Sequence, residues 1–238
     1  MLAVRTGVAA AVRLARLSTA ATAASDSPHA LPLAELADDH RAWLARSDEF
    51  RDLSPQVHSA VGILLCEKAS APHLLLLHRA AHMRSHPNQL SLVGGRRDNE
   101  DASLAETLVR EAEEEIGVIR GGEHALRLHG ALPVVYPSLA GLAVGVFAGS
   151  LHHGDWNVAA DESQALLEIP LADLVRPDAM VVESIQGYPG PVWHLGIDGV
   201  DVPLWGLTAR ILYDYFVLLD PAGATTKMMA ETEAKAGY

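Results

Sequence analysis

The chain has 238 residues, 49% of them apolar, and a formal net charge of −12 at pH 7. That length and apolar content suffice for one enzyme-sized domain, and no apolar run reaches the roughly 18 residues that a membrane span needs. The acidic balance makes nucleic-acid binding unlikely without a basic partner. A single cysteine, Cys66, excludes an internal disulfide, and its place in the apolar run VGILLC favours a buried, inert thiol over a nucleophile.

The first 25 residues differ in character from the rest, because they contain three arginines, many alanines and no acidic residue. This composition is typical of a transit peptide, and we expect residues 1–25 to direct the protein to the mitochondrion. A flexible terminus without a targeting role is the alternative. Residues 26–220 are expected to form the main domain, and 221–238 a polar, mobile tail.

The pattern of apolar residues predicts a helix at 33–44, several strands, and a closing helix at 204–219. The strands are expected at 59–66, 73–78, 89–93, 125–135, 142–148, 165–169 and 180–183. This order favours an α/β fold with helices on both sides of a mixed sheet.

Three histidines recur every four residues from the end of the second expected strand, at His78, His82 and His86. On a helix this spacing would suit zinc, but Pro87 and the preceding apolar strand argue against a helix there. We therefore do not expect a zinc site.

The segment from Gly94 to Val118 is the most informative of the chain. A helix capped by Asp101 would place Glu111, Glu114 and Glu115 on one surface, at spacings of three and four residues. Like charges at these spacings repel, so the cluster favours a bound divalent cation, and carboxylate oxygens suit magnesium or manganese better than zinc. The alternative is the solvated face of an amphipathic helix.

The flanking residues weigh against that alternative. Gly94 and Gly95 permit a tight turn and close approach of the backbone to a substrate, and Gly117 can end the helix in a left-handed conformation. The opposite helix face carries apolar residues at core spacing: Ala105, Leu108, Ala112 and Ile116. These features predict a helix held by its apolar face, with its acidic face directed at metal and a diphosphate.

This segment resembles the Nudix hydrolase signature, G-x5-E-x7-R-E-U-x-E-E-x-G-U, where U is bulky and aliphatic. The matching residues are Arg110, Glu111, Glu114, Glu115, Gly117 and Val118. The interval from Gly95 to Arg110 is one residue longer than in the generic pattern, as it is in the coenzyme A diphosphatase branch, whose GGxxDxxD form matches here at Gly94, Gly95, Asp98 and Asp101.

Two further segments resemble the same branch. RAAHMRSHPNQLSLVGG is similar to R-S-x-x-L-R-x-H-x-G-x-V-x-F-P-G-G, with Asn88, Leu92 and Val93 in place of Gly, Phe and Pro. Downstream, WGLTARIL from Trp205 resembles W-G-x-T-A-x-I-L. Trp205 by itself would more often be a core residue than a ligand platform.

The resemblance implies an α/β/α sandwich with a mixed β-sheet and a loop–helix–loop metal site, in which Glu111, Glu114 and Glu115 hold Mg²⁺ or Mn²⁺. Arg110 is expected to support these carboxylates rather than to touch substrate. The general base is expected from Glu162 or from Glu114.

For the substrate's phosphates, we expect contacts from Arg79, Arg84 and His86, with Gly94 and Gly95 beside them. The leading hypothesis is a metal-dependent hydrolase that cleaves coenzyme A or acyl-CoA to 3',5'-ADP and 4'-phosphopantetheine. The alternatives are another nucleoside diphosphate derivative (a dinucleotide, a nucleotide sugar or an RNA 5' end), or a non-catalytic binding protein. A homodimer is left open.

Overall fold

The computed structural model describes residues 57–119, 125–137, 143–154, 156–176, 179–219, 230, 231 and 234. The chain divides into two compact units, with a boundary between Glu168 and Ile169. The predicted transit peptide at 1–25 and the predicted helix at 33–44 lie outside the described residues, as does most of the tail. Within the described part, no helix is both long and apolar enough to span a membrane.

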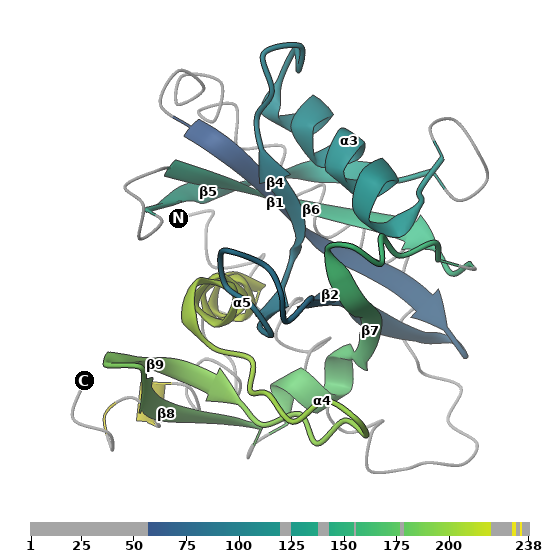
Figure 1. Cartoon of the computed structure of the whole chain (residues 1–238). Coiled ribbons are helices and arrows are strands. Elements are labelled where there is room, and N and C mark those ends of the chain that lie inside the picture. Colours follow the sequence, from purple (N-terminus) through teal and green to yellow (C-terminus); the bar gives the residue numbers. More distant parts are fainter. Residues whose placement is uncertain are drawn as a thin grey trace, which may run out of the picture. The chain divides into compact units, whose positions relative to one another are not determined.

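Among the described residues, seven strands form a mixed sheet in the unit that ends at Glu168, and the last of them continues two residues beyond it (Figure 1). At its centre, β1 (Val57–Lys68) is parallel to β6 (Ala143–His152) and antiparallel to β2 (Ala71–Arg79) and β4 (Val93–Arg96). At the margins, β3 (Leu90–Ser91) and β7 (Ser163–Pro170) pair with β2, and β5 (Arg127–Pro137) pairs with β6. The predicted mixed sheet is confirmed. Its central strand carries a continuous buried run, as a strand covered on both faces does.

The helix α3 (Leu104–Ile116) carries the acidic residues. It begins after Ser103, whose side chain accepts a hydrogen bond from the amide of Glu106 at 3.2 Å, and not after Asp101 as the sequence suggested. It ends where expected, at Gly117, which has φ 73° and bonds back to the last turn.

The apolar face of α3 packs on the sheet as predicted. Leu108, Ala112 and Ile116 are fully buried. Helix and strand approach closely, since a Cβ on Gly62 of β1 would lie 3.0 Å from Leu108 Cδ2. Figure 1 shows α3 in teal beside β4, along one face of the sheet. Burial of this face fixes which side of α3 remains available for chemistry.

Gly94 and Gly95 lie in β4, not in the tight turn that the sequence suggested. Gly94 has φ 136° and pairs with Val61, and a side chain there would collide with the carbonyl oxygen of Ala60. The close approach at Gly94 is between strands, and an approach of this backbone to a substrate stays a prediction. The single strand expected at 89–93 is divided in two, because Leu92 pairs with neither neighbour.

The second unit contains α4 (Leu171–Val175), a hairpin of β8 (Met180–Ile185) and β9 (Tyr188–Trp193), and α5 (Gly206–Leu219). Trp193 is among its core residues: it is fully buried, donates from its indole to the carbonyl of Leu174 at 3.0 Å, and meets Phe216 edge to face. Trp205, at the start of the resembling segment, is only partly buried. The expected closing helix is present as α5.

Candidate active site

Two glutamates of α3 lie against the glycines of β4. The amide of Gly94 donates to Glu115 Oε2 at 2.8 Å, and the Glu115 side chain is almost completely buried. A Cβ on Gly95 would overlap the carboxylate of Glu111. Glycine at position 95 therefore lets the strand backbone approach Glu111, whereas Gly94 reaches Glu115 through its amide.

The carboxylates of Glu111, Glu115 and Glu162 interact electrostatically. Burial raises the pKa of Glu115 to about 8. The Gly94 amide lowers that pKa, the charges of Glu111 and Glu162 raise it, and the charge of Arg79 lowers it. Burial also raises the pKa of Glu111, which Arg110 opposes. The charge of a loop residue distant in sequence thus acts on both helix glutamates.

Arg110 lies among acceptors on every side. Its Nε and Nη2 each bond one oxygen of Asp101 at 3.1 Å, and Nη2 also bonds the carbonyl of Arg96 at 2.8 Å. Ion pairs to Glu111 at 3.1 Å and Glu114 at 2.9 Å complete its environment. Hydrogen bonding from Arg110 lowers the pKa of Asp101 to about 2. The guanidinium therefore orients carboxylates.

Glu114 differs from its two neighbours. Its side chain is 59% exposed and pairs with Arg110, whereas the Glu111 side chain is 14% exposed. Among the described residues, no three acidic, histidine or cysteine side chains stand together closely enough to bind one metal ion. The donor set still suits a hard divalent cation, because Glu111, Glu115 and Glu162 offer only oxygens, and the charge of Glu162 raises the pKa of both helix glutamates.

Glu162 reaches this site because its loop bonds to the end of α3. The amide of Asn157 donates to the carbonyl of Ile116 at 3.2 Å, and the amide of Ala159 donates to the carbonyl of Glu115 at 3.1 Å. These carbonyls have no partner within the helix, so the loop satisfies them. The backbone of α3 thereby positions the loop that carries Glu162.

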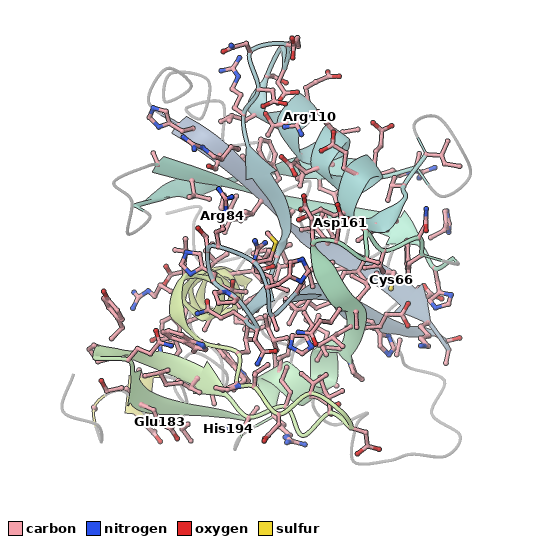
Figure 2. All side chains as sticks on the ribbon, viewed as in Figure 1. Cys66, Arg84, Arg110, Asp161, Glu183 and His194 are labelled. Carbon is pink, nitrogen blue, oxygen red and sulfur yellow. The ribbon has the colours of Figure 1, made fainter. Side chains whose placement is uncertain are left out.

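The candidate phosphate contacts lie on and after β2. Arg79 ends that strand, and its Nε is buried without a hydrogen-bond partner among the described residues. Arg84 and His86 are exposed on the following loop. Figure 2 labels Arg110 on α3, and Arg84 and Asp161 on the two loops. The charge of Arg79 acts on the carboxylate cluster, because it lowers the pKa of Glu115.

Sequence reasoning missed the role of Asp101. It was expected to cap α3, yet its side chain is buried and holds Arg110 instead. An acid nine positions before an arginine fits no helical or strand spacing, so the local pattern gave no signal of this pair.

Comparison with known proteins identifies the family. The NUDIX domain matches residues 56–181. A protein named "Uncharacterized Nudix hydrolase NudL" from an Enterobacter species is 34% identical over 72% of this chain and 88% of its own length. A protein of the same name from Salmonella heidelberg is 31% identical over 68% of this chain and 87% of its own. A solved MutT/nudix family protein from Enterococcus faecalis aligns with TM-score 0.44 and 17% identity, covering 79% of this chain and 76% of that one.

The predicted mitochondrial location is wrong. The relatives named above are bacterial proteins, and bacteria have no mitochondria. An arginine-containing, alanine-rich segment has the composition of a transit peptide without thereby being one.

The domain match, the relatives and the α/β sandwich with its mixed sheet agree with the carboxylate site on α3. Nudix enzymes generally use divalent metal ions to hydrolyse diphosphate bonds in small molecules. The chain belongs to the Nudix family and is a hydrolase of diphosphate bonds.

Proposed function

We propose that this enzyme cleaves the diphosphate bond of coenzyme A or acyl-CoA, giving 3',5'-ADP and 4'-phosphopantetheine, free or acylated. The observation that carries the proposal is the carboxylate cluster of Glu111, Glu115 and Glu162 beside Arg79. The substrate assignment rests on the resemblance of the segments around Asp101 and Trp205 to the coenzyme A diphosphatase branch.

Glu111, Glu114 and Glu115 are the proposed ligands of Mg²⁺ or Mn²⁺. The cation would neutralise the diphosphate oxygens and acidify the attacking water. Glu115 is supported by its buried carboxyl, and Glu111 by its contact with the β4 backbone. To bind the cation, the exposed side chain of Glu114 would have to rotate away from Arg110. Arg110 keeps the carboxylates oriented.

Glu162 is the proposed general base, which accepts the proton of the attacking water. Its charge acts on both Glu111 and Glu115, which supports a place beside the reacting atoms. Glu114 is the alternative base, but its carboxylate pairs with Arg110, and that ion pair would have to open before the carboxylate could accept a proton from water. We expect Glu162→Gln to lower kcat about 100-fold or more, and Glu114→Gln to act chiefly on the metal requirement.

Arg79 is the best supported contact for the substrate's phosphates. A buried donor without an acceptor is costly, and a phosphate oxygen would satisfy the Arg79 Nε. Arg84 and His86, exposed on the next loop, are proposed to bind the outer phosphates of the substrate.

The test is incubation of the purified protein with coenzyme A and magnesium or manganese, with 3',5'-ADP measured as product. Glu115→Gln should abolish product formation. Glu113→Gln, a matched change on the same helix but on a different face, should leave it largely intact. Absence of 3',5'-ADP above the Glu115→Gln level would refute the coenzyme A assignment.

A second candidate is another nucleoside diphosphate derivative, favoured by the departures from the coenzyme A motif. Leu92 and Val93 are buried in the core, so their replacement of Phe and Pro bears on packing. Asn88 is exposed on the loop of Arg84 and His86, so its replacement of Gly changes the loop that carries the proposed phosphate contacts. Competition of coenzyme A with dinucleotides and nucleotide sugars at equal concentration decides between them, because the ratio of kcat/KM values measures specificity.

A further inference from the structure

Two segments far apart in sequence are joined by backbone hydrogen bonds. The amide of Ala80 donates to the carbonyl of Glu162 at 2.8 Å, and His82 Nε2 lies 2.9 Å from the carbonyl of Asp161. The first segment, 80–89, is called here the phosphate loop, and the second, 159–164, the base segment. Any group that fixes one segment therefore acts on the other.

Three side chains add a second connection between them. Gln164 Nε2 donates to the carbonyl of Arg79 at 2.9 Å and to Asn88 Oδ1 at 3.0 Å. The same Asn88 oxygen lies 2.8 Å from His78 Nε2. The buried His78, on β2, thus meets the exposed end of the phosphate loop through Asn88.

One proton arrangement satisfies all of these contacts. The two amide protons of Gln164 are used by Arg79 and Asn88. Asn88 Oδ1 has two lone pairs, so it accepts a second bond, and His78 must carry its proton on Nε2. The 3.3 Å approach of Gln164 to His78 then joins two donors and is no hydrogen bond.

The backbone explains why asparagine fits here. Asn88 has φ 55°, a left-handed conformation that glycine and asparagine adopt more readily than other residues. The coenzyme A motif has glycine at this position, and glycine would leave both Gln164 and His78 without this acceptor. Asparagine keeps the backbone shape and adds the connection.

We propose that Asn88 is a positioning residue, which with His78 and Gln164 keeps the phosphate loop in register with the base segment. This inference rests on the proposed roles of Arg84, His86 and Glu162. It implies that phosphate binding and proton transfer are coupled in this enzyme through a side chain that touches neither substrate nor metal.

Amide hydrogen exchange of the substrate-free protein tests the coupling without any assumption about the substrate. Asn88→Gly removes the acceptor without straining the backbone. Exchange should become about fivefold faster both in the phosphate loop and in the base segment. Ser70→Gly is the matched control, since Ser70 has φ 61° in the exposed turn between β1 and β2. Ser70→Gly should leave the exchange rates of both segments unchanged. Faster exchange confined to the phosphate loop, or in neither segment, overturns the proposal.

Kinetics test the consequence for the reaction, with the diphosphate that the wild type hydrolyses fastest in a screen. Asn88→Gly should raise KM and lower kcat together, with a loss of about tenfold in kcat/KM, while Ser70→Gly matches wild type. His78→Leu should show a similar loss. His78→Gln should recover most of it, because the glutamine amide donates from nearly the same place as Nε2.

Unchanged kinetics of Asn88→Gly, or equal impairment of His78→Gln and His78→Leu, overturn the inference even if exchange is altered. Failure of the proposed function is distinguishable. If the fastest substrate is not coenzyme A, the coenzyme A assignment falls, while the Asn88 test proceeds unchanged on that substrate.

Discussion

The buried carboxyl of Glu115 makes the stability of the protein depend on pH. Its pKa is raised from 4.5 to about 8, so the folded state binds a proton that the unfolded state releases. The stability contributed by this group is complete below the unfolded pKa and is lost as pH rises through about 8.

We therefore expect the melting temperature of the protein in chelator to fall between about pH 5 and pH 8, and Glu115→Gln to reduce that fall. Because a cation competes with the proton, stabilisation by magnesium or manganese should be larger near pH 8.5 than near pH 6. Thermal unfolding with and without metal measures both effects. Equal metal stabilisation at the two pH values would contradict this account, and Glu113→Gln serves as the control.

Asp101 has the opposite effect on the pH dependence of stability, because its pKa is lowered to about 2. Its contribution is present above the unfolded pKa and disappears as pH falls toward 2. Asp101→Asn should lower the free energy of unfolding by about 1–3 kcal/mol, since Arg110 is left with fewer charged partners. Activity should fall as well, because Arg110 also orients Glu111.

Asp98→Asn is the matched control for that substitution. Asp98 lies 3.8 Å from Arg110 and is 60% exposed, so its loss should cost at most about 0.5 kcal/mol. Denaturant unfolding at neutral pH compares the two variants. Equal destabilisation by both would rule out the special role given to Asp101.

At the scale of elements, the C-terminus of α3 joins the helix to the loop that carries Glu162. Gly117 has φ 73°, and a Cβ there would lie 2.7 Å from the Cβ of Asn157. Gly117→Ala combines backbone strain with a collision, so we expect a loss of about 2 kcal/mol or more in unfolding free energy and a lower kcat.

Gly187→Ala separates the two causes. Gly187 has φ 84° in the β8–β9 turn, but nothing lies within 4 Å of an added Cβ. Strain alone should cost about 1 kcal/mol there, without effect on kcat. If Gly117→Ala behaves like Gly187→Ala in both measurements, contact with the loop is unimportant.

Sequence patterns predicted elements best where burial and periodicity agree. The apolar stripe of α3 and the apolar runs of β1 and β2 led to the correct element types. β9 was missed because Pro189, Gly190 and Pro191 are residues that strands disfavour, and its pairing with β8 overrides that preference. α4 has only five residues, too few to show a helical period.

The site was predictable only in part, for a related reason. Glu111 and Glu115 share a helix, so their spacing shows their proximity. Glu162 and Asp101 join them through loop and strand geometry, which local periodicity does not record. Glu162 was proposed from the resemblance to the family, whereas the pair of Asp101 with Arg110 appeared only in three dimensions.

At the scale of the whole molecule, the net charge of −12 bears on the substrate class. The polyanionic backbone of RNA would be repelled, so we expect no retention of single-stranded RNA by the protein alone at about 150 mM salt. Gel-shift or fluorescence-anisotropy titration measures this. Micromolar binding would revive an RNA 5' end as substrate, and a positively charged arginine-rich peptide is a suitable positive control for the assay.

The parallel pairing of β1 with β6 also governs when the protein can fold. Val61 lies opposite Val146 in the ladder between these strands, which brings together chain positions that are made far apart in time during synthesis. In the sheet, β6 lies between β1 and β5. It must therefore emerge from the ribosome before β1 and β5 can be joined into one sheet. Until then one backbone edge of β1 lacks its partner strand, which makes the nascent chain a candidate client for chaperones.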